Sequence, residues 1–237
     1  MFPLGTALLP GEPLPLRIFE PRYRQMLTDC LDDTSDGPRF EPGAKRAGRS
    51  GQAPGANRAG RSGQAPEVER AGRFGVVLIA RGHEVGGGDV RHDIGTFARI
   101  ENVLAQPDGR ASLTCTGAER FRVIEWLADD PYPRAMTETL PAIEIDAEDE
   151  SSLRALALEL RAFVDEVAEV RPEAVPVGLP DFDVADLAVF GVFEWATRLP
   201  IGPADRQRLL ECHSVADQVT VLHDVIEGLT AMIRFGR

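Results

Sequence analysis

The spacing of apolar residues changes near Pro141, and this change limits the possible folds of the chain more than any other feature. Before Pro141, short apolar runs lie between Gly, Pro and Asp residues, as expected for strands. The clearest run, FGVVLIA at residues 74–80, is typical of a strand that is buried on both faces. After Pro141, apolar residues recur every three or four positions, which is the spacing of one helix face. The sequence therefore predicts an α+β fold, with a β-rich domain over residues 1–144 and an all-α domain over residues 145–237.

The individual elements follow from the same patterns. The PDG sequence at residues 107–109 is a hairpin signal, and we interpret Pro10, Pro13 and Pro15 as a turn. Several short strands at this spacing suggest a small barrel or a folded sheet. Strands are predicted over residues 2–9, 74–80, 94–105, 111–116, 120–127 and 134–140. Helices are predicted over residues 20–31, 151–170, 184–198, 204–211 and 215–233.

A repeat of twelve residues interrupts the β-rich part. The sequence RAGRSGQAP at residues 46–54 recurs at residues 58–66. Val68 is the only large aliphatic residue within residues 41–73. Such a segment cannot bury enough apolar surface to offset the entropy lost on ordering it. We interpret residues 41–73 as a disordered insertion, which a fold tolerates because long surface loops cost little stability.

The charge of the chain argues against nucleic acid as a general partner. The net charge is −12, and a surface of this sign repels phosphate backbones. The insertion is the exception, because residues 39–73 contain eight basic and three acidic residues. A tether for nucleic acid or for an acidic partner is therefore the alternative interpretation of the insertion.

The common catalytic and metal-binding motifs are absent from the sequence. Lys45 is the only lysine and lies in the insertion, which excludes a phosphate-binding P-loop and a Ser–Lys dyad. There is no GxSxG elbow, and the histidines show neither HExxH nor paired-ligand spacing. The three cysteines lie far apart and form no CxxC pair. We expect no enzymatic activity, no catalytic residues, no cofactor and no metal.

The location of the protein is predicted from what the sequence lacks. No apolar run approaches the roughly 20 residues that a membrane helix needs. The N-terminus has no basic segment of the kind that begins a signal peptide. We therefore expect a cytoplasmic protein that does not contact a membrane.

A glycine-rich loop follows the apolar run at residues 74–80. It contains His83, Glu84, Gly86 and Gly87, but it lacks the GxGxxG spacing of a dinucleotide site. We interpret it as a mobile connection between strands that needs glycines at positive φ. The alternative is a loop that contacts a ligand.

Several runs of residues resemble one known family. They are FPLG at residues 2–5, LPLRIFEPRY at 14–23, FGVVLI at 74–79, DIGT at 93–96 and ERFRV at 119–123. Together they resemble the N-terminal, substrate-binding domain of Lon proteases, a domain type that also occurs alone in small bacterial proteins and, more distantly, in cereblon. The resemblance implies a PUA-like β-domain, a pseudo-barrel, followed by a helical bundle. It also implies recognition of unfolded or tagged polypeptides without catalysis, since the ATPase and peptidase regions are missing.

The resemblance leaves the binding residues and the partner open. Phe19, Arg22 and Tyr23 are candidates for contacts with a polypeptide. The structural alternative makes Phe19 a helix staple, pairs Arg22 with an acid and places Tyr23 in the core. A protease or chaperone acting in trans is a possible partner, while an RNA-binding protein that uses the insertion and a small-molecule sensor are the alternative functions. The sensor would need an aromatic cage, and the only tryptophans are Trp126 and Trp195.

Overall fold

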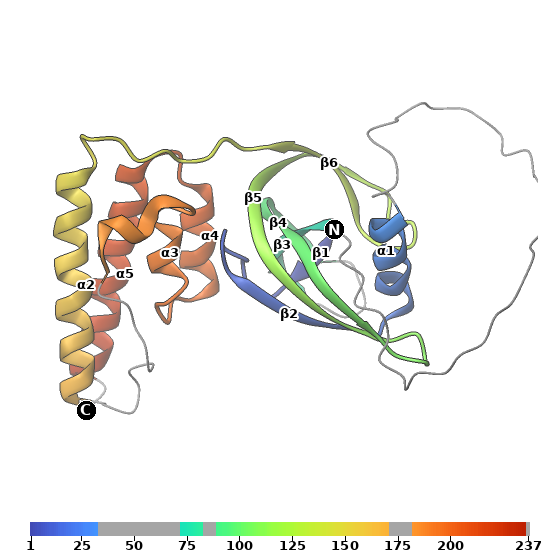
Figure 1. Ribbon diagram of the computed structural model, residues 1–237, viewed down its shortest axis with the longest axis horizontal. Coiled ribbons are helices and arrows are strands. Elements are labelled where there is room, and N and C mark those ends of the chain that lie inside the picture. Colours follow the sequence, from blue (N-terminus) through green and yellow to red (C-terminus); the bar gives the residue numbers. More distant parts are fainter. Residues whose placement is uncertain (33–71, 83–88, 171–181, 236–237) are drawn as a thin grey trace, which may run out of the picture.

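The computed structural model describes residues 1–32, 72–82, 89–170 and 182–235, which form a curved sheet beside a helical bundle (Figure 1). The described strands make one mixed sheet in the order β1-β3-β4-β5-β2, and β6 also pairs with β5. The strands are β1 (Phe2–Leu4), β2 (Pro13–Ile18), β3 (Arg73–Arg81), β4 (Val90–Ala105), β5 (Ala111–Leu127) and β6 (Arg134–Thr139). The α+β fold with strands first and helices second is therefore confirmed.

The long strands β4 and β5 give the sheet its curvature. Their antiparallel register shifts between Thr96 and Ala98 and again between Ile100 and Asn102. Such irregularities bend a strand and increase its twist, so the pair curls around an apolar core. Helix α1 (Pro21–Asp32) packs its buried face into this core at one end of the sheet (Figure 1).

The helical lobe is built around two long helices that run in the same direction. They are α2 (Glu150–Val170) and α5 (Val215–Phe235). Glu159 contacts His223 at 2.5 Å, and Glu166 accepts a 2.6 Å hydrogen bond from Arg234 further along both helices. The short elements η3 (Val184–Ala188), α3 (Phe193–Ala196) and α4 (Pro203–Glu211) pack against this pair (Figure 1).

Two buried arginines join the lobes. The guanidinium of Arg120 on β5 donates 2.7 Å hydrogen bonds to the carbonyls of Leu210 and Cys212 at the end of α4. These carbonyls lack helical partners because the helix ends there. In the other direction, Arg206 on α4 donates from Nε to the Ala7 carbonyl at 2.9 Å. The lobes are thus fixed together by charged donors on backbone acceptors.

Pro10 lies in a turn, as predicted, but Pro13 and Pro15 lie in strand β2. Among the described strands, β2 is an edge strand that pairs with β5, with Pro13 opposite Thr116 and Pro15 opposite Thr114. The two prolines are two positions apart, so both nitrogens point to the same side. At the open edge a missing N–H loses no ladder hydrogen bond, and this is where sheets accept proline.

Three other predicted boundaries were wrong. The first strand ends at Leu4, and Ala7 and Leu9 instead join the core of the helical lobe. The strands predicted over residues 111–116 and 120–127 are one continuous strand, β5. The helix predicted over residues 184–198 is broken, because Gly191 has φ +58° between η3 and α3. A glycine in the left-handed conformation interrupts a helix. The apolar residues just before it, Val189 and Phe190, are exposed and half-buried.

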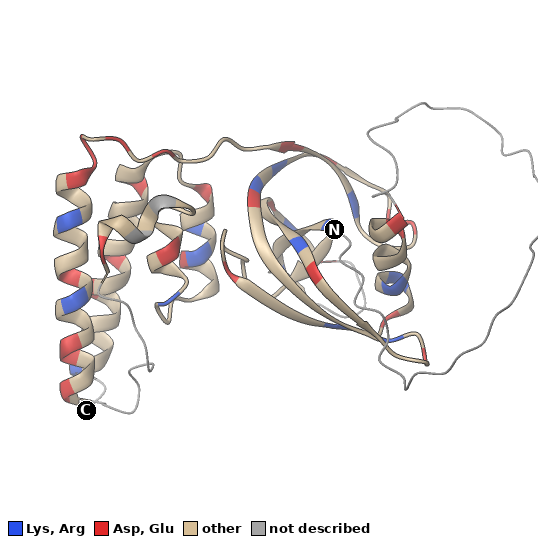
Figure 2. Cartoon of the chain, in the orientation of Figure 1, with Lys and Arg blue, Asp and Glu red and all other residues tan. Residues whose placement is uncertain are grey.

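None of the described helices combines the length and the apolar character that a membrane span requires. Acidic side chains occur on the helices of the bundle, with fewer basic side chains between them (Figure 2). The predicted insertion falls mostly on residues 33–71, which lie outside the described residues. The domain boundary expected after residue 144 lies between β6 and α2 and remains a prediction.

Candidate functional site

A groove of about 790 Å³ lies between the sheet and the helical bundle. Its walls come from segments that are far apart in the sequence. They are the middle of β5 at residues 117–120, the connection between β6 and α2 at residues 140–145, the segment from η3 to α3 at residues 184–193, and Gln218 of α5. Binding sites commonly form where two packed units meet, and this volume is within the usual range for them.

One wall of the groove presents apolar side chains that are not fully covered. Val189 is 75% exposed, and Phe190 is half-buried beside it. The ring of Phe190 packs over Gly11, where an added Cβ would lie 2.6 Å from the ring. Gly11 also has φ +80°, so this position requires glycine for both space and backbone conformation. The aromatic wall is therefore held in place while its outer edge remains open.

Arg120 fixes the shape of the groove as well as the contact between the lobes. Besides the two carbonyls of α4, its guanidinium donates to the carbonyl of Pro141 at 3.1 Å. The backbone carbonyl of Arg120 accepts a 2.9 Å hydrogen bond from the Leu140 amide. Arg120 is 6% exposed, and its bonds to Leu210 and Cys212 are buried, whereas the bond to Pro141 is partly buried. They attach the connection between β6 and α2 to the sheet.

Gln218 is a buried polar residue in the lining of the groove. Its exposure is 1%, and its Nε2 has no hydrogen-bond partner among the described residues. A buried donor without a partner carries a desolvation cost that a ligand acceptor would relieve. At the rim, Glu119 and Glu144 add negative charge.

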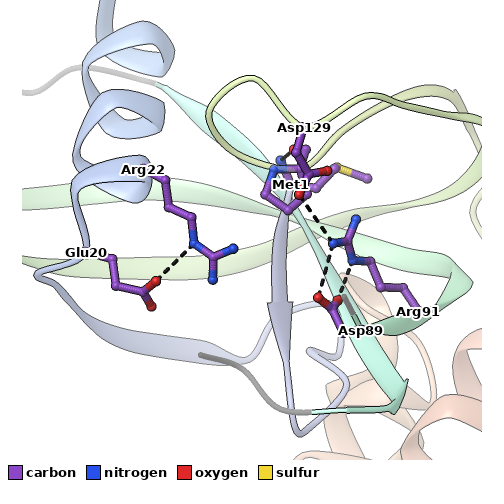
Figure 3. A network of polar contacts seen from close by, with 7 residues as sticks. Met1, Glu20, Arg22, Asp89, Arg91 and Asp129 are labelled. Carbon is purple, nitrogen blue, oxygen red and sulfur yellow. Dashed lines mark hydrogen bonds and ion pairs between the residues drawn. The ribbon is translucent and has the colours of Figure 1, made fainter. Parts of the chain in front are cut away.

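The three predicted polypeptide contacts lie elsewhere, at the start of α1. Figure 3 shows Arg22 beside Glu20. Arg22 donates from Nε to Glu20 at 3.0 Å, and its guanidinium lies 4.5 Å from the Tyr23 ring centroid. Tyr23 is 3% exposed, and burial raises the pKa of its hydroxyl to about 12. Phe19 is 57% exposed. The structure thus brings Arg22 and Tyr23 together and leaves Phe19 at the surface.

A polar network near this helix was not foreseen from the sequence (Figure 3). Asp89 accepts two hydrogen bonds from Arg91, which also contacts Asp129 at 3.8 Å. The hydrogen bond from Arg91 is the main reason that the pKa of Asp89 lies below its usual value. The Met1 amine donates to the Pro133 carbonyl at 2.7 Å. The network therefore connects the N-terminus, the start of β4 and the loop between β5 and β6, and it pairs Arg91 with two carboxylates.

The remaining candidate from the sequence is the predicted ligand loop. His83, Glu84, Gly86 and Gly87 of the predicted ligand loop lie outside the described residues. Among the described residues, no three His, Cys, Asp or Glu side chains gather as metal ligands would.

The two tryptophans are far apart in the fold. Trp195 is fully buried in the helical core. Trp126 on β5 donates from Nε1 to Asp93 at 2.8 Å and lies 5.0 Å from the Arg91 guanidinium. The aromatic side chains of the groove are instead Phe190 and Phe193.

Comparison with known proteins gives one consistent family. Residues 1–228 match the family model of the ATP-dependent protease La (LON) substrate-binding domain. The chain is 28% identical over 138 residues to Lon protease 2 of Herpetosiphon aurantiacus, covering 57% of the chain and 16% of that protein. It is 33% identical over 82 residues to Lon protease of Anaeromyxobacter dehalogenans, covering 35% of the chain and 10% of that protein. The chain therefore spans about a sixth or less of these relatives.

Two solved structures have a similar fold. A Lon N-terminal domain protein from Xanthomonas campestris has a TM-score of 0.53 at 22% identity, with 95% of each chain covered. The N-terminal domain of Mycobacterium avium complex Lon protease has a TM-score of 0.51 at 16% identity, covering 95% of this chain and 96% of that one. The likeness extends over both the sheet and the helical bundle.

Proposed function

The chain belongs to the ATP-dependent protease La (LON) substrate-binding domain family, and we propose that it binds unfolded or tagged polypeptides in the groove between its lobes. The observation that carries this proposal is the open apolar wall at Val189 and Phe190, which faces a groove of about 790 Å³. Unfolded polypeptides differ from folded proteins mainly in the apolar side chains that they expose. An open apolar groove is suited to bind such side chains without reading one fixed sequence.

The proposed role is recognition without chemical change. The family model occupies residues 1–228, so the 237 residues contain a substrate-binding domain but neither an ATPase nor a peptidase domain. The groove is lined mainly by apolar side chains and backbone, and Arg120 is fully engaged in structural hydrogen bonds. Processing of a bound polypeptide would fall to a protease or chaperone that acts in trans.

The test is a binding titration with a labelled, permanently unfolded polypeptide. Val189→Asp places a charge on the apolar wall, where an apolar contact with the polypeptide would bury it. We expect the Kd to rise about tenfold or more, because burying an unpaired polar group costs about 1–3 kcal/mol. The matched control is Leu104→Asp on β4, a residue that is 62% exposed and not part of the groove.

Leu104→Asp should leave the Kd within about twofold, because surface substitutions away from a contact change little. Equal affinities for the unchanged chain, Val189→Asp and Leu104→Asp would exclude the groove as the binding site. A short RNA at two salt concentrations tests the alternative function. Salt-sensitive RNA binding that disappears when residues 41–71 are deleted would move the function to the insertion.

A further inference from the structure

We infer that the groove holds its polypeptide as an added β-strand, paired with the backbone of residues 141–145. This inference rests on the polypeptide binding proposed above and specifies how the polypeptide is held. It assigns a binding role to a connection in which the sequence shows no recognised binding motif. Three features support it: unpaired backbone, a buried unpaired amide and the charge of the rim.

The first feature is a stretch of backbone without partners. The ladder of the sheet ends with the hydrogen bond from the Leu140 amide to the Arg120 carbonyl at 2.9 Å. Beyond Pro141, the peptide groups of residues 142–145 make no hydrogen bond with any residue that the structure describes. The chain nevertheless follows a nearly straight path from β6 toward α2 (Figure 1). Unpaired donors and acceptors on a straight chain are what an open strand edge offers to another strand.

The side chains of this segment alternate as they do in a strand. Ile143 and Ile145 are half-buried and pack against the core of the helical lobe. Ala142 and Glu144 are exposed. A period of two is the mark of an extended backbone. The two isoleucines fix the segment in place, so a polypeptide would meet an edge that is already ordered.

The second feature is the amide of Gln218 in the lining of the same groove. Its Nε2 is buried and has no hydrogen-bond partner among the described residues. An extended polypeptide carries a carbonyl on each residue, and those on the side away from the paired edge have no partner of their own. The carboxamide of Gln218 can bond to such a group. The groove thus offers hydrogen bonds to the backbone of the polypeptide from two sides, the segment 142–145 and Gln218. Such binding does not depend on the sequence of the polypeptide.

The third feature is the charge of the rim, which limits the side chains of the occupant. Glu144 is exposed, and Glu119 has only a 3.8 Å contact with Arg73 at an exposed position. Arg99, which also lines the groove, is already paired with Glu101 at 2.9 Å. With a net charge of −12 for the chain, the rim favours basic and disfavours acidic residues. The occupant is therefore an extended segment with alternating apolar side chains flanked by basic residues.

The experiment uses a synthetic peptide of ten residues that alternates Val and Ser between terminal arginines. Hydrogen exchange of the amides at residues 142–145 is measured in the full chain, with and without the peptide. Because successive peptide groups of a strand point to opposite sides, we expect alternate amides, either 142 and 144 or 143 and 145, to exchange at least about tenfold more slowly. Unchanged exchange at all four amides while the peptide binds would overturn strand addition.

Two N-methylated forms of the peptide supply a matched control. The first form is methylated at every second amide and so lacks the donors on one side of the strand. The second form is methylated at the remaining amides and lacks the donors on the other side. Strand addition requires one form to bind at least about tenfold more weakly and the other to bind like the parent peptide. Equal affinities for the two forms would contradict it.

The variant Gln218→Met tests the second feature, because it removes the amide and nearly retains the size of the side chain. We expect about tenfold weaker peptide binding with an unchanged or higher unfolding temperature, since a buried unpaired donor is lost. Unchanged affinity would overturn the part assigned to Gln218. If the peptide fails to bind but the unfolded polypeptide binds, only strand addition fails. If neither binds, the proposed function fails as well.

Discussion

The start of helix α1 and the groove between the lobes both combine apolar and polar side chains, but they differ in what surrounds these side chains. At the start of α1, Arg22 is paired with Glu20 and lies over Tyr23, which is buried in the core. In the groove, Val189 is exposed and the Nε2 of Gln218 has no partner among the described residues. The Tyr23 hydroxyl also has no partner among the described residues, but it is enclosed in the core. Val189 and Gln218 instead line a groove that a ligand can enter.

This difference explains why the most recognisable sequence does not mark the groove. The run LPLRIFEPRY builds β2 and the first turn of α1, where each residue has a defined place in the fold. A site for variable polypeptides needs an apolar surface and free backbone, neither of which requires particular residues in a fixed order. Specific motifs therefore indicate the architecture here, while the binding surface follows from the packing of the two lobes.

The largest expected effect concerns Arg120, which belongs to the groove but has all of its bonds within the protein. Arg120→Met would leave three backbone carbonyls, at Leu210, Cys212 and Pro141, without this donor. We expect the free energy of unfolding to fall by about 3–5 kcal/mol, since the carbonyls of Leu210 and Cys212 stay buried without this donor. Polypeptide binding should weaken too, because the connection after β6 loses its attachment to the sheet.

Denaturant unfolding of Arg120→Met measures this effect, and Arg99→Met is its control. Arg99 lines the same groove but forms an exposed pair with Glu101. Exposed pairs contribute about 0–1 kcal/mol, so this variant should unfold almost like the unchanged chain. Similar losses in the two variants would mean that Arg120 does not hold the lobes together.

The second effect concerns the polar network beside α1 and depends on pH. Because Arg91 lowers the pKa of Asp89 in the folded state, the ionised carboxylate stabilises the fold. This contribution is complete above the ordinary pKa of 3.8 and is lost as the pH falls through the lower pKa of the folded state. At neutral pH, Asp89→Asn should lower the free energy of unfolding by about 1.5–3 kcal/mol, as expected for a hydrogen bond to a charged group.

The measurement compares the unfolding free energies of the two chains between neutral pH and pH values below 3.8. Other carboxylates titrate in both chains, so only the difference between the chains reports on Asp89. That difference should shrink as the solution becomes more acidic. If the difference in unfolding free energy stays constant with pH, the charge of the Asp89 carboxylate does not stabilise the fold.

The sequence predicted the arrangement of the fold well because apolar spacing is a local signal. Residues such as Leu153, Leu156 and Leu160 recur with helical spacing and are all fully buried in the core of the bundle. The prediction failed where tertiary structure overrides that signal. Pro13 is accepted in β2 because the strand lies at the sheet edge, and edge position is a property of the whole sheet.

The groove could not be found from the sequence for a related reason. Its residues come from the two halves of the chain and meet only after the lobes pack together. Val189 and Phe190 look like part of a central helix, since their neighbours are apolar on most sides. The helical run breaks at Gly191, which has φ +58°, and Val189 and Phe190 line the groove. A single glycine within an apolar run gives little warning of such a break. Gly191 is the one local signal that could have suggested a break.

The smallest expected effect concerns Phe19, which tests directly whether the start of α1 takes part in binding. Phe19→Ala removes an exposed ring outside the groove, so we expect the unfolding free energy to change by less than about 0.5 kcal/mol. Affinity for the unfolded polypeptide should change by less than about threefold, well below the effect of Val189→Asp on the same titration.

If Phe19→Ala weakens binding as strongly as Val189→Asp, the start of α1 is a second contact surface, as the sequence predicted. The polypeptide would then have to extend from the groove across the sheet to α1, and a longer unfolded segment would bind more tightly than a short one. If only Val189→Asp weakens binding, length beyond the groove adds nothing, and the ring of Phe19 is free surface.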